Sequence, residues 1–374
     1  MVNIAKNCQR IVLLSGTPIN NSALDLFYLM DLLMPDYLGD LSFFKNNFHN
    51  KIKKSKVDFE LTAGVDLSQI RDGSQENDEN SRNDHDSALQ AMLHLHKMMT
   101  PFLLRRMKSE VLQSLPPRTI INQITQLSSA QQKFYQQIQN DKHLSNFSKM
   151  RKLLQICQDL GWFLSESNEP EKRDVNYRNP KLESLLEILS TNPEGDHKYL
   201  IFFQNQSLIP RIQEKIIKNI SKISENHIGI IDSSIDPKIR HQTCETFQDA
   251  NSNLKILLLT TSSGSLGLNL TAADICIFYE HDWNPNKDIQ AMDRCYRIGQ
   301  NKSVFVYKLI SDSAIERRIV EVQEQKKQLI EKVIHSREVL DDNVVTDVGD
   351  VFNEVLSSKQ SEIVEESDSE VEFL

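Results

Sequence analysis

Two arginines stand three residues apart in the stretch "EHDWNPNKDIQAMDRCYRIGQNK". Asn284, followed by a proline, is a favourable helix start, and Gly299 is a favourable stop, so a helix of about four turns is predicted between them. In that helix Gln290, Arg294 and Arg297 lie at i, i+4 and i+7 and share one face. Two guanidiniums one turn apart could meet the negative charge of a transferring phosphoryl group, which is the role of an arginine finger.

A plainer alternative is a solvated helix in which Asp293 pairs with Arg297 at i, i+4, a contact worth only ~0.2–0.5 kcal/mol. The spacing of two arginines by itself favours this alternative. The wider pattern reverses the preference, because five residues together match a helicase-type motif: Gln290, Arg294, Arg297, Gly299 and Gln300.

A second group of polar residues follows a buried apolar run in "LLLTTSSGSLGLNLTAAD". Its glycines let backbone approach a phosphate closely, and its hydroxyls can donate to phosphate or ribose oxygens. The alternative is an ordinary turn between a strand and a helix. We predict nucleotide contacts at Gly264, Gly267 and Asn269, together with Gly299 and Gln300 of the arginine stretch. The predicted DNA contacts are Thr260, Thr261 and Ser262.

Three other places could bind phosphate or nucleic acid. In "RIVLLSGTPINN" a predicted strand over residues 10–14 ends in a tight turn at Gly16, Thr17 and Pro18, which we interpret as a coupling element, the alternative being a simple helix cap. In "PFLLRRMKSEV" a mostly apolar helix would carry Arg105, Arg106 and Lys108, either as a phosphate contact or as a solvated basic edge. Trp283 is either an aromatic wedge towards nucleic acid or a core residue.

The elements around these residues predict the fold class. Beyond residue 180, apolar runs such as "KYLIFFQ", "KILLLTT", "ICIFYE" and "VFVYKLI" alternate with helical patterns. Continuous apolar strands are typical of parallel strands covered on both faces, so we predict an α/β doubly wound parallel sheet. The last helix, over residues 314–334, carries an apolar stripe that is expected to face the core: Ile315, Ile319, Val322, Leu329 and Val333.

The charge is unevenly distributed along the 374 residues. The net charge is −9, yet residues 338–374 contain twelve acidic residues and one lysine, which leaves the rest slightly basic. Global acidity therefore does not exclude DNA, because the electrostatic footprint of a DNA-binding protein is local. No apolar run approaches the ~18 residues of a membrane span. The five cysteines are widely spaced, which favours buried free thiols over zinc or disulfides.

The ordered motifs resemble the SWI/SNF-like branch of helicase superfamily two, from Arg10 almost to Ile334. "LLSGTPINN", "YLIFFQ", "TTSSGSLGLNLTAAD" and "QAMDRCYRIGQ" are similar to its third to sixth motifs, in the family's order. Within that branch, "DLFYLMDLLMPDYLG", "PFLLRRMKSEVLQSLPPR", "SSIDPKIR" and "EHDWNPNKDIQAMDR" resemble the subfamily that removes TATA-binding protein from promoters.

This resemblance implies a domain organisation. Residues 1–60 would be the helix-rich C-terminal remnant of a first RecA-like lobe, 61–87 a disordered polar insertion, and 88–165 a helical protrusion and interlobe region. Residues 180–336 would be a RecA-like second lobe, the helicase C-terminal lobe with its closing helix, and 337–374 an acidic flexible tail. Because only the last part of a first lobe would be present, Leu26, Phe27 and Leu33 are expected to be left exposed. The sequence is expected to be a shortened form of a longer protein.

The resemblance also implies function. Such proteins hold ATP and Mg²⁺ between two lobes, translocate on double-stranded DNA in the nucleus and displace a DNA-bound protein, here TATA-binding protein. The sequence contains neither a GxxxxGK[ST] P-loop nor a DEAH-like box. The chain alone is therefore predicted not to hydrolyse ATP, with the missing lobe as a candidate partner chain.

The sequence departs from the family pattern at three positions, which bear on its activity. Ser233 and Ser265 stand where glycines are usual, and Tyr296 stands where a histidine is usual. An alternative to the motor is a non-catalytic DNA-binding or assembly module. A serine hydrolase using Ser263 or Ser265 with His281 and Asp282 is the weakest alternative, because no GxSxG elbow is present.

Overall fold

The structure is a computed structural model that describes most of the chain between residues 8 and 335. The described residues are 8, 10–15, 22–54, 87, 90, 91, 94, 95, 97–104, 106, 108, 112, 114–166, 177–191, 197–264 and 267–335. The coupling residues Gly16, Thr17 and Pro18 lie outside this set, as do Arg105, Ser265, the acidic tail and all but the last residue of the predicted insertion.

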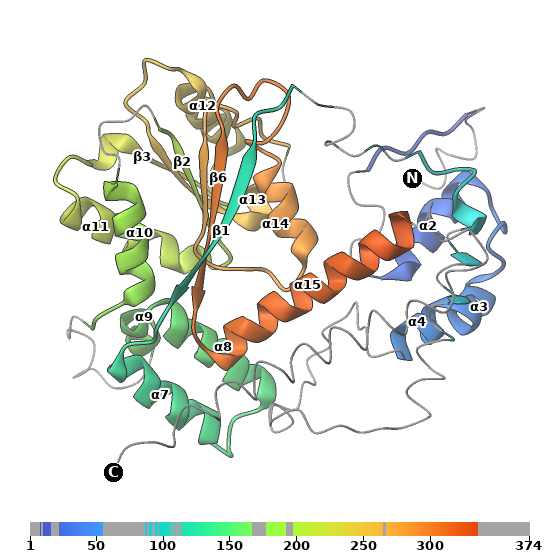
Figure 1. The fold of residues 1–374 in the computed structure, drawn as a ribbon, viewed down its shortest axis with the longest axis horizontal. Coiled ribbons are helices and arrows are strands. Elements are labelled where there is room, and N and C mark those ends of the chain that lie inside the picture. Colours follow the sequence, from blue (N-terminus) through green and yellow to red (C-terminus); the bar gives the residue numbers. More distant parts are fainter. Residues whose placement is uncertain are drawn as a thin grey trace, which may run out of the picture. The chain divides into compact units, whose positions relative to one another are not determined.

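Six parallel strands form one sheet in the order β1-β6-β5-β2-β4-β3 (Figure 1). Their bounds are β1 Arg118–Thr125, β2 Tyr199–Phe203, β3 Ile228–Ile231, β4 Ile256–Thr260, β5 Ile275–Phe278 and β6 Val304–Ser311. After β2 the chain adds β3 and β4 on one side of this strand and then β5 and β6 on the other, so the strand order changes direction at β2. Ligands of open α/β sheets bind at the carboxyl ends of strands around such a point.

Alternate side chains of each central strand enter two different cores. In β2, Tyr199, Ile201 and Phe203 pack with α10 (Pro180–Ser190) and α11 (Ile209–Asn219) on one face. Leu200 and Phe202 pack with α12 (Pro237–Gln248) and α14 (Pro285–Met292) on the other. The predicted α/β doubly wound parallel sheet is therefore confirmed, and its two-sided burial is the reason that these strands are apolar throughout.

The sheet begins earlier in the sequence than the predicted lobe boundary at residue 180. β1 lies within the segment predicted as a helical interlobe region, yet it pairs with β6 along its whole length, from Arg118 opposite Val304 to Thr125 opposite Ser311. The helices that follow it are α7 (Ser129–Asn140), α8 (Asn146–Gln158) and α9 (Leu160–Ser165). They share a core with Ile315 of α15 (Ala314–His335). The sheet therefore takes one strand from the segment predicted as the interlobe region, ahead of the predicted lobe at residues 180–336.

The region before the sheet is helical, and its first segment contradicts a predicted strand. Residues 10–15 form no strand, and Val12 and Leu14 are 81% and 94% exposed. A parallel strand needs a neighbour to receive its backbone hydrogen bonds, and none of the described residues supplies one. The helices here are α2 (Ala23–Leu33), α3 (Leu41–Phe44), the π-helix η1 (Lys45–His49) and α4 (Asn50–Lys54).

Three apolar side chains of α2 were expected to lack a cover. Leu26 and Phe27 are instead buried, and the Phe27 ring lies 5.0 Å from that of Phe44, while Leu33 is half-buried. The expectation is wrong for the first two because α3 and η1 fold back onto α2 and supply a small aromatic core.

Four of the cysteines are buried free thiols as predicted, whereas Cys8 is exposed. Of the predicted stripe on α15, Ile315, Ile319 and Val322 are buried. Within the described part of the chain, no helix is both long enough and apolar enough to cross a membrane.

Candidate functional site

The helix that precedes the two arginines is shorter than predicted. Asn284 caps it as expected, accepting from the Asn286 amide, but α14 ends at Met292 after eight residues. The carbonyl of Arg294 accepts a hydrogen bond from Leu270 N at 3.0 Å, so it does not continue the helical ladder. We call residues 293–300 the arginine loop. The predicted single helical face for Gln290, Arg294 and Arg297 is therefore wrong: only Gln290 lies on the helix.

The two guanidiniums nevertheless lie within electrostatic reach of each other. Arg294 and Arg297 are both half-buried. Burial lowers the pKa of Arg294, and the charge of Arg297 lowers it further, against an opposing contribution from Asp293. The alternative pairing of Asp293 with Arg297 is not formed, because Asp293 binds Lys108 at 2.6 Å. The loop thus brings two cations together, and such a pair is suited to an incoming phosphate.

One residue of the arginine stretch is structural. Gln300 is buried, and its Nε2 donates to the carbonyls of Thr271, Ala273 and Cys295 while its Oε1 accepts from Lys302 N. The predicted nucleotide contact at Gln300 is corrected, since its amide is fully used in tying the arginine loop to the segment after β4. Gly299 has a φ of +101°, so it makes the left-handed turn that a glycine favours.

The glycine loop is open at one predicted position. Gly267 has a φ of +78°, and a Cβ placed there would meet no atom within 4 Å. Asn269 is exposed two residues later, and Leu270 provides the backbone link to Arg294. Gly264 ends the short helix α13 (Thr261–Gly264). The segment 267–270 therefore combines an open glycine with a backbone hydrogen bond to the arginine loop.

Most of the hydroxyls expected to contact DNA are turned inwards. Thr260 donates to Ser263 Oγ at 2.7 Å, and Thr261 donates to the Phe203 carbonyl at 3.2 Å; all three hydroxyl residues are buried. These contacts stabilise the turn after β4, so Thr260 and Thr261 are not presented to a ligand as predicted. Ser262 also donates to Thr260 Oγ1, at 3.2 Å, but this residue is exposed, so its predicted DNA contact stays a prediction.

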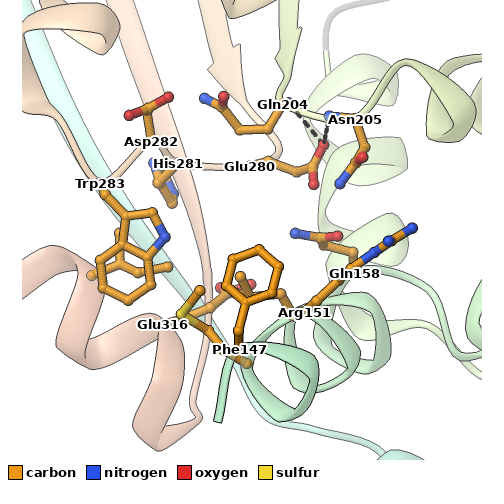
Figure 2. A pocket seen from close by; sticks show the side chains of 13 residues that line it. Phe147, Arg151, Gln158, Gln204, Asn205, Glu280, His281, Asp282, Trp283 and Glu316 are labelled. Atoms are coloured by element: carbon orange, nitrogen blue, oxygen red, sulfur yellow. Dashed lines mark hydrogen bonds between the residues drawn. The ribbon is translucent and has the colours of Figure 1, made fainter. Parts of the chain in front are cut away.

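Trp283 lines a cavity of about 240 Å³ at the carboxyl ends of β2 and β5 (Figure 2). It is half-buried and packs against the core formed by α7, α8 and α15, which fits the core interpretation of this residue. The lining labelled in Figure 2 also includes Phe147, Arg151, Gln158, Gln204, Asn205, Glu280, His281, Asp282 and Glu316. Three carboxyl groups face one arginine among them, so the charge of this cavity does not favour a DNA phosphate.

Glu280 is the most perturbed carboxyl of this cavity. Its Oε2 accepts hydrogen bonds from the amides of Gln204 and Asn205, each at 2.8 Å. Its Oε1 is buried and has no hydrogen-bond partner among the described residues. Burial raises the pKa of Glu280 to about 7, although the two amides act in the opposite direction. The carboxyl thus fixes the end of β2 at the point where the sheet topology reverses.

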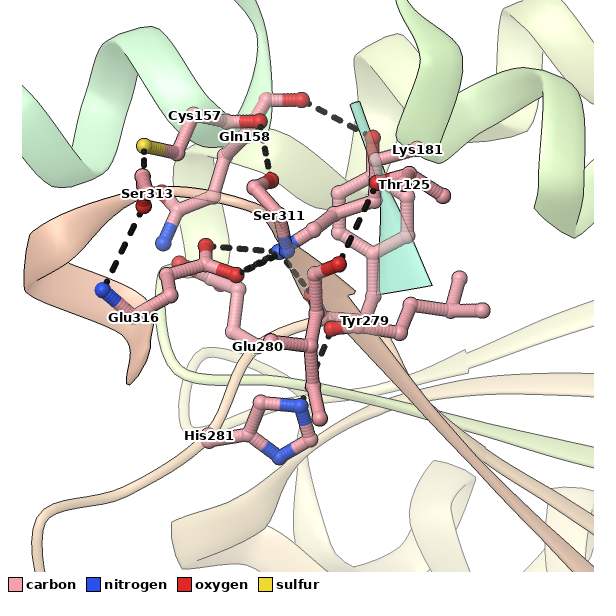
Figure 3. Close-up of polar contacts among 12 residues, drawn as sticks. Thr125, Cys157, Gln158, Lys181, Tyr279, Glu280, His281, Ser311, Ser313 and Glu316 are labelled. Atoms are coloured by element: carbon pink, nitrogen blue, oxygen red, sulfur yellow. Dashed lines mark hydrogen bonds and ion pairs between the residues drawn. The ribbon is translucent and has the colours of Figure 1, made fainter. Parts of the chain in front are cut away.

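A buried ion pair below the cavity was not anticipated from the sequence (Figure 3). Lys181 donates to the two carboxylate oxygens of Glu316 at 2.6 and 2.8 Å and to the Tyr279 carbonyl at 3.3 Å. Glu316 also accepts from Ser311 N at 2.6 Å, so α10, α15, β5 and β6 meet here. The available signal was that Lys181 stands at i, i+4 and i+8 with Leu185 and Leu189 on the buried stripe of α10.

The basic segment before β1 behaves differently from its prediction. Arg106 is exposed and lies in a non-helical stretch, so the predicted basic helix edge is not seen at this residue. Lys108 instead reaches the arginine loop, 3.0 Å from the Tyr296 carbonyl.

The serine hydrolase arrangement is absent from the described residues. Ser263 is bonded to Thr260, and His281 contacts the Leu309 carbonyl at 3.0 Å and Asp288 at 3.7 Å rather than Asp282. No nucleophile–base pair forms, so this alternative is dropped.

Two family models match consecutive parts of the chain. The SNF2-related domain matches residues 3–169, and the helicase conserved C-terminal domain matches residues 180–299. TATA-binding protein-associated factor mot1 of Aspergillus fumigatus is 32% identical over 370 residues, covering 87% of this chain and 18% of its own length. The human TATA-binding protein-associated factor 172 is 31% identical, covering 86% of this chain and 19% of its own length.

Two further proteins are similar to the chain. The ISWI chromatin-remodeling complex ATPase ISW1 of Saccharomyces cerevisiae is 32% identical over 86% of this chain and 27% of its own length. The solved C-terminal part of the Fun30 ATPase domain is similar with a TM-score of 0.44 and 19% identity, over 56% of this chain and 90% of that one. The chain spans about a fifth of the length of the TATA-binding protein-associated factors. It belongs to the SWI/SNF-like ATPases of helicase superfamily two, near the subfamily of these factors.

Proposed function

We propose that the sheet unit, residues 118–335, is the second lobe of an ATP-dependent translocase on double-stranded DNA. Arg294 and Arg297 would stabilise the charge of the transferring phosphoryl group, and Gln290 would assist them from α14. One observation carries this proposal: the hydrogen bond from Leu270 N to the Arg294 carbonyl joins the arginine loop to the segment that begins at the open Gly267. Cations and unobstructed backbone amides are the two components of a phosphate site.

The residues present fit the phosphates of ATP, because the arginine pair and the open glycine match an anionic ligand. Among the described residues no group of three acidic, histidine or cysteine side chains gathers at one point. By the resemblance to the family, Mg²⁺ would be held by the first lobe, which also carries the P-loop. Bound ATP supplies the phosphoryl group, and the role of this chain is to neutralise its developing charge.

The substrate is proposed from the relatives. Their names associate them with TATA-binding protein. We infer that this chain acts in the nucleus on a DNA-bound protein, with TATA-binding protein as the candidate, and that the exposed Ser262 contacts DNA. Gly16, Thr17 and Pro18 are retained as the proposed coupling turn and Arg105 as a proposed DNA contact, all outside the described residues.

DNA-stimulated ATP hydrolysis tests the proposal. The chain alone is expected to show none, because no P-loop cradles the phosphates. Joined to, or mixed with, a first lobe that bears a P-loop, it should hydrolyse ATP when DNA is added. Arg294→Ala or Arg297→Ala should then lower kcat about a thousandfold. Arg318→Ala is the matched control, since that arginine pairs with Glu321 on the surface of α15. An unchanged kcat in both arginine-loop variants would refute the proposed role.

A binding or assembly role is the second candidate, favoured by the absence of a P-loop in the printed sequence. It predicts DNA binding by the chain without any ATPase activity on addition of the first lobe.

A further inference from the structure

Tyr296 lies in the arginine loop between the two arginines, and two cations flank its ring. Arg118 Cζ is 4.9 Å from the ring centroid and Lys108 Nζ is 5.9 Å from it. A cation within about 6 Å of an aromatic face is attracted by the ring quadrupole. The ring therefore holds two cations that would otherwise repel each other.

Lys108 also contacts both ends of the backbone around Arg294. Its Nζ lies 2.6 Å from Asp293 Oδ1 and 3.0 Å from the Tyr296 carbonyl. Asp293 is the C-cap of α14, so the ammonium sits at the negative end of that helix. One lysine thus fixes the residues on each side of the catalytic candidate Arg294.

Both cations come from the chain that leads into the sheet. Arg118 is the first residue of β1, and Lys108 precedes it by ten residues. They reach a loop almost two hundred residues later in the sequence. We call Lys108, Arg118, Asp293 and Tyr296 the loop clamp; it ties the segment entering the second lobe to the residues that face the phosphates.

We propose that Tyr296 is a positioning residue, and that the loop clamp holds the arginine loop in its phosphate-facing geometry and transmits movement of the entering segment to it. The second part rests on the proposed function. The family pattern has a histidine at this position, and a protonated imidazole would repel Lys108 and Arg118, whereas a tyrosine ring attracts them. The replacement of the family's histidine by Tyr296 therefore changes the contacts that fix the arginine loop.

Amide hydrogen exchange of the full chain tests the clamp without reference to catalysis. Tyr296→Leu removes the quadrupole, and Lys108→Met removes the charge with little change of shape. Each is expected to raise exchange in residues 293–300 about fivefold and to leave β2 and β4 unchanged. Tyr296→Phe, which keeps the ring, should match the wild type. The clamp is overturned if Tyr296→Leu exchanges like the wild type, or if Tyr296→Phe exchanges like Tyr296→Leu. Should Tyr296→Leu misfold, the Lys108→Met and Tyr296→Phe pair makes the same comparison.

Kinetics with an added P-loop lobe test the positioning role. Tyr296→Leu is expected to lower kcat about fivefold with KM for ATP unchanged, whereas Tyr296→Phe restores kcat. Equal kcat in wild type and Tyr296→Leu would overturn the positioning role while the ATPase itself stands. Absence of ATPase in the wild type would instead contradict the proposed function, and the exchange measurement then decides the clamp by itself.

Discussion

The two ends of α14 carry opposite chemistry, although only eight residues separate them. At its N-terminal end, Glu280 and Asp282 line an acidic cavity with aromatic walls. At its C-terminal end, Arg294 and Arg297 lie in a loop whose backbone is hydrogen-bonded to Leu270. Both ends face strand termini of the same sheet, yet only one of them is suited to an anion.

The difference comes from how each end satisfies its charges. At the acidic end, Glu280 accepts two backbone amides and Glu316 is paired with the buried Lys181, so these carboxylates are used within the fold. At the basic end, Asp293 binds Lys108, and the charges of Arg294 and Arg297 act on each other. The two ends therefore differ in the sign of the charges that they gather.

The largest expected effect is at the acidic end. Lys181→Met leaves the Glu316 carboxylate buried without its ammonium, and we expect it to lower the free energy of unfolding by about 3–5 kcal/mol. Arg178→Met is the matched control, because Arg178 pairs with Glu183 on the surface, where solvent screens the pair, and its loss should cost far less. Urea denaturation of both variants compares them. If both variants lose a similar free energy of unfolding, burial does not make the Lys181–Glu316 pair more important than the Arg178–Glu183 pair.

A second test uses the pH dependence of stability. Burial raises the pKa of Glu280 from 4.5 to about 7 in the folded chain. The folded state therefore binds this proton more tightly, and the contribution of Glu280 to stability is lost as the pH rises from about 4.5 to about 7. Relative to Glu280→Gln, the wild type should lose on the order of 3 kcal/mol over that interval. Denaturation at several pH values measures it, and a flat difference between the two proteins would contradict a raised pKa.

The smallest effect is expected at the open glycine. Gly267→Ala should cost about 1 kcal/mol, because a φ of +78° disfavours a Cβ even where space is free. Gly267→Asn should cost less, since asparagine tolerates this conformation better. Gly229 is the contrasting glycine: a Cβ there would lie 2.7 Å from Leu257 Cδ2, so its constraint is packing. At Gly229, asparagine should therefore lower the stability more than alanine does. Thermal unfolding of the four variants measures the stability cost of each substitution. The same ranking of alanine and asparagine at both glycines would show that the two are not constrained differently.

The sequence was a good guide wherever a local pattern decides the structure. The cap at Asn284, the turn at Gly299 and the two-sided burial of β2, β4 and β5 all follow from residue type and periodicity. It was a poor guide to hydroxyl orientation after β4, where Thr261 bonds to Phe203 of a neighbouring strand. It also missed the end of α14, because a hydrogen bond from Leu270 competes with the helical ladder.

The sequence by itself determined the fold class and the residue types of the phosphate-facing site, since apolar runs, glycines and arginines keep their properties wherever they are placed. Only the tertiary structure decided which polar groups remain available to a ligand. Gln300 and Thr260 are used inside the fold, Lys181 is paired in the core, and Tyr296 holds two distant cations. These outcomes depend on partners far away in the chain, and no local pattern encodes a hydrogen bond or an ion pair between residues brought together by the sheet.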